Sequence, residues 1–285
     1  MSTLDKQIES YHSYMKLKNY SNQTIASYLR TVRMFYDFRS DRKMRGRINE
    51  EHAKQYLLMR IESGCSWSTI NCDYSALRKY FQNIINARWS IKKIPRPQKE
   101  RTLPEILSQE EVVKLIEHAP TYKHQVFLTF IYGTGLRLSE ALNITFEDID
   151  GNRLQIKINK GKGAKDRVVQ IPECLLNLLR TYYRRLKPKD YLFNGLKKGS
   201  KYSHRAAQWS IIRARELAGI KKTASIHTLR NCYATHHIEN GTDLVFLQEQ
   251  LGHKHLKTTA RYVRLCMERY RRIDHPIAHM EIKYR

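Results

Sequence analysis

The sequence predicts a mainly α-helical (α+β) fold in two domains, a helical N-terminal one and a mostly helical second one with a small antiparallel β-sheet. Three observations support this prediction. Apolar residues recur at intervals of three and four through the first hundred residues, a charged segment with several prolines follows, and one pair of alternating segments comes later. The 285 residues also suit two domains at about 100–200 residues each.

Four helices are expected in the first domain. Ser21 is placed as the N-cap of one, and further periodic runs follow Asn49 and either Ser66 or Ser68. The segment near residues 4–17 supplies the fourth. The clearest apolar stripe belongs to the Ser21 helix and comprises Ile25, Tyr28, Leu29, Val32, Phe35 and Tyr36.

A linker is predicted over residues 95–104, because its three prolines break helices and its charges favour solvent. A capping-box pattern from Ser108 to Glu111 then begins a new helix. The first domain is therefore assigned to residues 1–94 and the second to residues 105–265.

One β-hairpin is predicted in the second domain. Residues 154–159 (LQIKIN) and 167–171 (RVVQI) alternate apolar and polar side chains, and GKGAK between them supplies a glycine-containing loop. Residues 266–285 form a C-terminal tail with a short apolar set.

The formal net charge of +25 indicates a polyanionic partner. Nucleic acid is the first choice and an anionic membrane surface the second. Residues 1–98 hold 18 Lys and Arg against 8 Asp and Glu, and the remainder holds 34 against 19. Both parts are basic, which favours two domains gripping one polyanion over one domain with a basic tail.

Several protein classes are disfavoured. The five cysteines are odd in number and contain no C-x-x-C pair, so neither a disulfide framework nor a zinc site is indicated. The N-terminal residues MSTLDKQIESYHSYM lack the apolar region of a secretory signal, and no apolar run approaches ~18 residues. The histidines show no metal-ligand spacing, which disfavours a metal-dependent nuclease. We expect a cytoplasmic protein without a membrane span, metal or cofactor.

Two candidate functional residues lie in glycine-containing motifs. Arg137, in GTGLRLSEAL, stands at the expected start of a helix, where the helix dipole disfavours a cation unless an anion lies opposite. Glu140 follows one turn later, so an ordinary salt bridge is the simpler interpretation. Lys162 lies in the hairpin loop, where flanking glycines allow close approach of a ligand, although a solvated turn lysine is the better interpretation of this residue alone.

The remaining candidates lie near the C-terminus. His227 and Arg230 form H-T-L-R, a spacing that places both on one helix face. His253 follows a glycine, and Tyr262 comes nine residues later on a helix expected to begin at Thr258-Thr259. Each residue alone is also compatible with a packing or surface role.

In this order, the motifs resemble the tyrosine recombinase (phage-type integrase) family. The resemblance covers nearly the whole chain, because the helical N-terminal domain is similar to that family's SAM-like core-binding domain. It implies a catalytic set with Tyr262 as nucleophile and Glu140 in support, the other members being Arg137, Lys162, His227, Arg230 and His253. Asn231, where the family often has histidine, and Val263-Arg264, where Thr-His is common, are departures that remove no catalytic group.

The resemblance implies a site-specific recombinase that cuts and rejoins DNA through a 3′-phosphotyrosyl intermediate, without metal ion or ATP. Cations at the phosphate fit this chemistry, because they favour formation of the phenolate and stabilise the charge of the phosphorane. The alternatives are a catalytically silent DNA-binding accessory protein and a type IB topoisomerase-like enzyme that nicks and closes DNA.

The implied partners are double-stranded recombination sites, bound by a homotetramer on two duplexes with a dimer on each site. In that assembly the tail, residues 266–285, docks on a neighbouring subunit. Without an extra N-terminal arm-binding domain, the chain suits a compact Xer-like or mobile-element enzyme, expected in the cytoplasm at the nucleoid.

Overall fold

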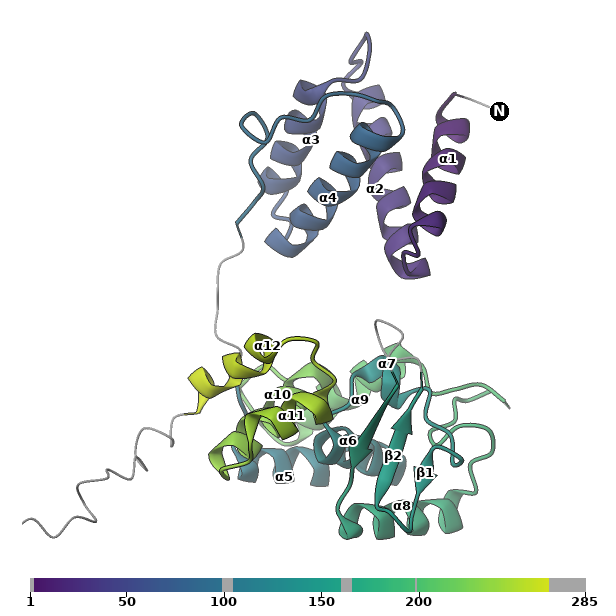
Figure 1. The fold of residues 1–285 in the computed structure, drawn as a ribbon, viewed down its shortest axis with the longest axis vertical. Coiled ribbons are helices and arrows are strands. Elements are labelled where there is room, and N and C mark those ends of the chain that lie inside the picture. The colour runs from purple at the N-terminus through teal and green to yellow at the C-terminus, as the bar shows by residue number, and fades with distance from the viewer. Residues whose placement is uncertain (1–2, 99–104, 160–165, 198, 267–285) are drawn as a thin grey trace, which may run out of the picture. The chain divides into compact units, whose positions relative to one another are not determined.

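The chain divides into two compact units, residues 1–102 and 103–285, which are described separately (Figure 1). The computed structural model describes residues 3–98, 105–159, 166–197 and 199–266. Within these ranges it contains twelve α-helices, one 3-10 helix and one three-stranded sheet. None of the described helices is long and apolar enough to cross a membrane. The predicted mainly helical fold with a small antiparallel sheet is confirmed.

The first unit consists of four helices with N-caps where the sequence offers short polar side chains. Ser21 accepts the backbone N–H of Thr24, which confirms the predicted cap. Ser66, rather than Ser68, caps the fourth helix. The helices are α1 (Thr3–Leu17), α2 (Asn22–Asp41), α3 (Glu50–Glu62) and α4 (Trp67–Asn83).

Aromatic side chains dominate the core of the first unit. Phe35 and Phe81 are fully buried and lie with ring centroids 5.9 Å apart, and Trp89 packs edge-on against Phe81 at 5.2 Å. The hydroxyl of Tyr11 donates to the carbonyl of Ala76 (2.9 Å), so its polar end is satisfied although it is buried.

The chain remains attached to the first unit after α4. Asn71 donates to the carbonyl of Pro97 (3.0 Å) and accepts from Arg96 Nε (3.1 Å). The start of the predicted linker 95–104 is therefore bonded to α4, and residues 99–104 lie outside the described residues.

The second unit begins with α5 at the predicted capping box, in which the Ser108 hydroxyl and the Glu111 carboxylate each accept the other residue's backbone N–H. Most of the unit packs around one apolar core. Its helices are α5 (Gln109–Glu117), α6 (Tyr122–Thr134), α7 (Leu138–Ala141), α8 (Glu173–Leu186), α9 (His204–Leu217), α10 (Ile226–Glu239), α11 (Leu244–Leu251) and α12 (Leu256–Ala260), followed by the 3-10 helix η1 (Arg261–Leu265).

The predicted hairpin is confirmed and has a third strand. Strand β2 (Gln155–Ile158) pairs antiparallel with β3 (Arg167–Gln170), Ile156 opposite Val169. Strand β1 (Ile149–Asp150) pairs with the other edge of β2. It was not predicted, since two residues are too few to show an alternating pattern. Strand β3 contacts α11, which brings the sheet beside the C-terminal helices.

Candidate active site

The turn between α6 and α7 positions the first candidate residue. Gly135 ends α6 in the left-handed conformation (φ 60°), and a Cβ there would lie 2.4 Å from the ring of Tyr233. Arg137 is the N-cap residue of α7, close to its predicted place at a helix start. Only glycine allows both the left-handed backbone and the close approach of Tyr233. The turn at Gly135 therefore sets the position of Arg137 two residues later.

Arg137 is tied to Glu140 and to the end of α11. Its Nη1 donates to Glu140 Oε1 (2.9 Å), and its backbone N–H donates to Oε2 (2.9 Å). Nη2 reaches the carbonyl of Gly252 (3.3 Å). The predicted pairing with Glu140 is therefore present, and the guanidinium still keeps 29% of its side-chain surface exposed.

Arg167, which the sequence analysis did not single out, completes this cluster. The first residue of β3, it holds Glu140 with two parallel bonds of 2.9 Å and donates from Nε to the carbonyl of Gln250 (3.2 Å). Burial opposes ionisation of Glu140, but the bonds and charges of Arg167, with those of Arg137, outweigh it and lower the pKa of Glu140 to about 2. Glu140 is thus an anion shared by two arginines.

Arg230 is the most deeply buried cation of the site, with 1% of its surface exposed. It lies on the first turns of α10 and donates to the carbonyls of Gly135 (2.6 Å) and Leu251 (2.7 Å), and to His253 Nε2 (3.0 Å). Burial and then the charge of Arg137 lower the pKa of Arg230 to about 10, so it remains cationic at neutral pH. None of these partners is an anion.

His253 follows Gly252, which ends α11 in the left-handed conformation (φ 63°). Since Arg230 donates to Nε2, the other ring nitrogen, Nδ1, carries the proton and faces the hydroxyl of Thr259 (2.9 Å). Burial, followed by the charges of Arg230 and Arg137, lowers the pKa of His253 to about 4. The ring is therefore neutral here.

His227 opens α10 one turn before Arg230, as the H-x-x-R spacing predicts. The residue is exposed, in contrast to Arg230. Desolvation of its ring, followed by the charges of Arg230 and Arg261, lowers its pKa. His227 is therefore a neutral, exposed imidazole that can accept a proton.

Tyr262 is buried, with 1% of its surface exposed. Its hydroxyl donates to Asn231 Oδ1 (3.2 Å), and its ring lies nearly parallel to that of His253 with centroids 6.2 Å apart. Arg261 lies over the Tyr262 ring at 5.3 Å. The structure thus brings Tyr262 beside His253 and α10, in a conformation closed to solvent.

The helix expected to begin at Thr258-Thr259 and to carry Tyr262 was predicted wrongly. Helix α12 begins at Leu256 and ends at Ala260, and Tyr262 lies in the 3-10 helix η1 that follows. Two adjacent β-branched threonines read as a helix start, but His255 takes the N-cap position.

Lys162 belongs to the hairpin loop and lies outside the described residues, as does most of the tail 266–285. In the part of the chain that is described, no three His, Cys, Asp or Glu side chains gather as a metal site requires.

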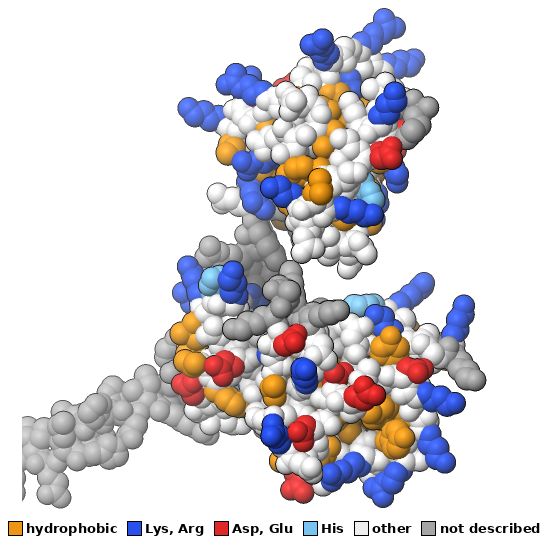
Figure 2. Space-filling model, turned by 45° about the vertical axis from the view of Figure 1, so that its right-hand side comes forward, with side chains coloured by type: hydrophobic (Ala, Val, Ile, Leu, Met, Phe, Trp, Pro, Cys, Tyr) orange, Lys and Arg blue, Asp and Glu red, His pale blue; other side chains and the backbone are white. Residues whose placement is uncertain are grey.

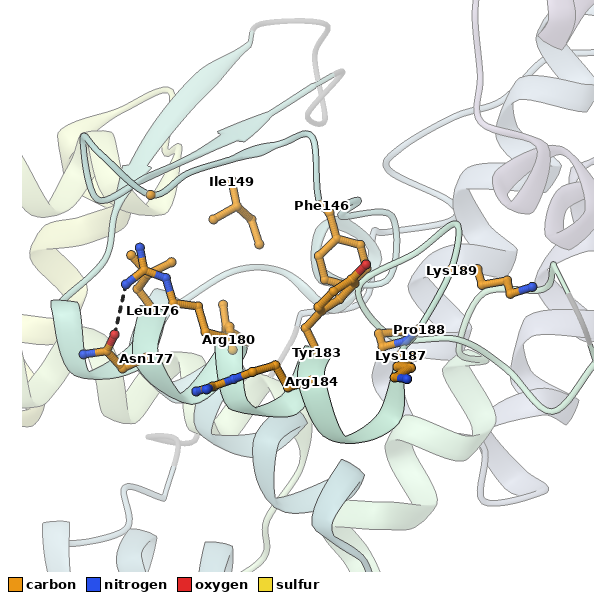
Figure 3. A pocket seen from close by; sticks show the side chains of 12 residues that line it. Phe146, Ile149, Leu176, Asn177, Arg180, Tyr183, Arg184, Lys187, Pro188 and Lys189 are labelled. Atoms are coloured by element: carbon orange, nitrogen blue, oxygen red, sulfur yellow. Dashed lines mark hydrogen bonds between the residues drawn. The ribbon is translucent and has the colours of Figure 1, made fainter.

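A cavity near the sheet is separate from this site. About 1030 Å³ in volume, it lies between α8 and β1, with Phe146 and Tyr183 on its apolar wall and Arg180, Arg184 and Lys187 at its rim (Figure 3). None of the candidate residues lines it. The candidate site is not a cavity of this kind. It is a cluster of side chains joined by hydrogen bonds and ion pairs.

Comparison with known proteins gives one consistent result. Residues 105–269 match the model of the phage integrase family, and residues 8–91 match that of the phage integrase N-terminal SAM-like domain. The tyrosine recombinase XerA of Thermococcus onnurineus is 34% identical, covering 95% of both chains. XerD of Staphylococcus epidermidis is 30% identical, over 93% of this chain and 96% of its own.

A solved structure also matches. The XerH site-specific recombinase bound to its difH substrate, in a pre-cleavage complex, is 25% identical with a TM-score of 0.67 and covers 87% of this chain and 79% of its own.

Proposed function

Because the chain belongs to the phage integrase family and is a site-specific tyrosine recombinase that acts on DNA, we propose that Tyr262 is the nucleophile that attacks the scissile phosphate. Arg137, Arg230 and His253 form the phosphate site. One observation carries the proposal: both arginines are bonded to carbonyls at the end of α11, and the next residue, His253, faces the ring of Tyr262.

In the proposed reaction the Tyr262 oxygen forms a bond to phosphorus as the bond to the 5′-oxygen breaks. His227 takes the phenol proton, and Lys162 gives a proton to the leaving oxygen. The products are a 3′-phosphotyrosyl link and a free 5′-hydroxyl, so the phosphodiester energy is retained. Attack by a different 5′-hydroxyl reverses the step and joins new strands, releasing Tyr262.

The cations stabilise the charge that develops on the phosphorane. Arg137 and Arg230 donate to the two non-bridging oxygens, and Glu140 holds Arg137 in place while Arg167 holds Glu140. A phosphate beside His253 favours its protonation, which converts Nε2 from an acceptor into a further donor.

The test is formation of a covalent adduct. The purified protein is incubated with nicked duplexes that carry its own site, quenched in SDS and assayed with EDTA present. We expect an adduct that survives EDTA and is lost in Tyr262→Phe, while DNA binding is kept. Tight, salt-dependent binding without any adduct on the correct site would instead favour a silent accessory protein. Cleavage and resealing by a monomer without strand exchange would favour the topoisomerase-like alternative.

We further propose that four subunits act on two duplexes, with the tail 266–285 docking on a neighbour, in the nucleoid of the cytoplasm. Exchange between two duplexes requires four strands to be cut, one by each subunit, and the basic charge of both units favours contact of each unit with DNA. Figure 2 shows Lys and Arg side chains spread over the visible surface of each unit. A chain truncated after Leu265 is expected to lose tetramers on DNA, as measured by light scattering, and normal recombination by it would contradict the docking role.

A further inference from the structure

The proposed nucleophile is held where no DNA phosphate reaches it. Tyr262 is 1% exposed and packs into a small apolar cluster distinct from the main core of the second unit. For attack, its hydroxyl must leave this cluster. The cluster consists of Tyr233, Ala234, Ile238, Leu247, Leu251, Tyr262 and Cys266.

One polar contact retains the hydroxyl in this cluster. Tyr262 donates to Asn231 Oδ1 at 3.2 Å, and Asn231 is itself 4% exposed. The neighbouring Arg230 directs its guanidinium elsewhere, to Gly135, Leu251 and His253. Two adjacent residues of α10 therefore have separate roles. Arg230 belongs to the proposed phosphate site, and Asn231 contacts the proposed nucleophile.

We propose that Asn231 is a positioning residue that retains the Tyr262 hydroxyl in a resting conformation and releases it when DNA is bound. The inference rests on the proposed function of Tyr262. An amide oxygen accepts a hydrogen bond without taking the proton, so the hydroxyl bonded to Asn231 keeps its proton. Before cleavage, the Tyr262 hydroxyl must therefore exchange its hydrogen bond to Asn231 for one to a group that can accept its proton, such as His227.

A second contact explains why Asn231 would control the side chain of Tyr262 and not the position of residues 261–266 as a whole. The thiol of Cys266 shares its one proton between the carbonyl of Thr235, one turn beyond Asn231 on α10 (3.6 Å), and that of Tyr262 (3.3 Å). Residues 263–266 are therefore joined to α10 by a contact that does not involve the Tyr262 hydroxyl. Removing the Asn231 acceptor frees the Tyr262 side chain while the segment stays in place.

The first test measures exposure of Tyr262 in DNA-free protein. Wild type, Asn231→Leu (similar size, no acceptor) and Asn231→Asp (acceptor kept) are nitrated, and each tyrosine is quantified by peptide mass spectrometry. Tyr182, 1% exposed in the main core, is the internal control. We expect nitration of Tyr262 relative to Tyr182 to rise about five-fold in Asn231→Leu, the effect of one lost hydrogen bond, and not to rise in Asn231→Asp. If the ratio of Tyr262 to Tyr182 nitration is unchanged in Asn231→Leu, the proposal is overturned. This holds even if both tyrosines react faster, since that would show general loosening of the fold.

The second test measures single-turnover cleavage at saturating DNA together with the Kd for DNA. Retention predicts faster cleavage by Asn231→Leu with an unchanged Kd, and a wild-type or lower rate for Asn231→Asp. Slower cleavage by Asn231→Leu overturns retention and makes Asn231 an aid to the chemistry. Nitration requires no activity, so absence of any wild-type adduct would defeat the proposed nucleophile while leaving the nitration result to decide the role of Asn231.

Discussion

The two units treat buried charge in opposite ways. In the first unit, Asp73 accepts from Arg60 (3.0 Å) and from the hydroxyl of Thr31 (2.6 Å), so one buried carboxylate meets one arginine. In the second unit, the single carboxylate of Glu140 is shared by Arg137 and Arg167. Arg230 adds a third guanidinium, which is buried and bonded to carbonyls and an imidazole.

This difference separates a structural ion pair from a binding site. Burying a charge is unfavourable unless it is paired, so a neutral pair such as Arg60 with Asp73 is explained by folding alone. Among the described contacts of these three arginines of the second unit, Glu140 is the one carboxylate, and it is bonded to Arg137 and Arg167 alone. This surplus positive charge suits an anion from outside, which the proposed function identifies as the scissile phosphate.

The largest expected effect is on chemistry in the second unit. Arg230→Ala is expected to reduce single-turnover cleavage by about a thousand-fold, because it removes a buried donor to the phosphorane. Arg230→Lys keeps the charge but loses the forked geometry, so its activity should remain well below wild type. Cleavage by Arg230→Ala within ten-fold of wild type, at saturating DNA, would break the distinction drawn between the units.

The matching change in the first unit should affect stability and leave chemistry intact. Arg60→Ala leaves Asp73 buried without its cation and is expected to destabilise folding by about 3 kcal/mol in urea unfolding. Arg153→Ala, which removes an exposed pair with Asp150 (3.9 Å), is the control and should change stability by less than about 0.5 kcal/mol. A loss of cleavage in folded Arg60→Ala would show that the first pair also serves the reaction.

Glycine substitutions sharpen the comparison at the level of the backbone. Gly135→Ala is expected to cost about 2 kcal/mol or more, because its Cβ would lie 2.4 Å from the ring of Tyr233 in addition to the strain at φ 60°. Gly64 has φ 71° and nothing within 4 Å of a built Cβ, so Gly64→Ala should cost only about 1 kcal/mol. Equal losses in thermal unfolding would mean that the contact with Tyr233 relaxes freely.

The surplus charge also predicts a dependence of stability on pH. The pKa of His253 falls to about 4 in the folded protein through burial and four arginines, so the unfolded chain binds its proton first as pH falls. Stability should therefore decrease from about pH 6.5 towards pH 4, by about 1–2 kcal/mol after allowance for solvent screening, and His253→Asn should remove this part.

His52 in the first unit is the control for that measurement. Burial and Arg39 lower its pKa too, but Glu51 opposes them. In urea unfolding between pH 7.5 and 4.5, His52→Asn should therefore change the slope less than His253→Asn does. The reverse order would contradict the concentration of positive charge at the second site.

Local signals predicted much of this structure. The Ser21 cap and the Ser108–Glu111 capping box each depend on residues within four positions, and the hairpin depends on alternation within two short segments. The order of motifs also named Arg137, Arg230 and His253, which the structure brings together at the end of α11, and Tyr262, which lies beside His253. Lys162 lies outside the described residues.

Contacts between distant segments were beyond such signals. Arg167 meets Glu140 from 27 residues away, and Asn231 meets Tyr262 from 31 residues away. Neither pair has a periodicity or spacing to reveal it, since side chains from separate elements meet only after the helices pack. The place of Arg167 at the start of the second hairpin segment, two residues after GKGAK, is the one signal that could have drawn attention to it.

The most direct test of the proposed nucleophile is to identify the residue to which DNA becomes covalently attached. A covalent adduct with a nicked site is digested with nuclease and protease, and the nucleotide-bearing peptide is identified by mass spectrometry. We predict a 3′-nucleotide linked through phosphate to Tyr262. A nucleotide on any other of the 18 tyrosines would contradict the proposed nucleophile and the site built around it.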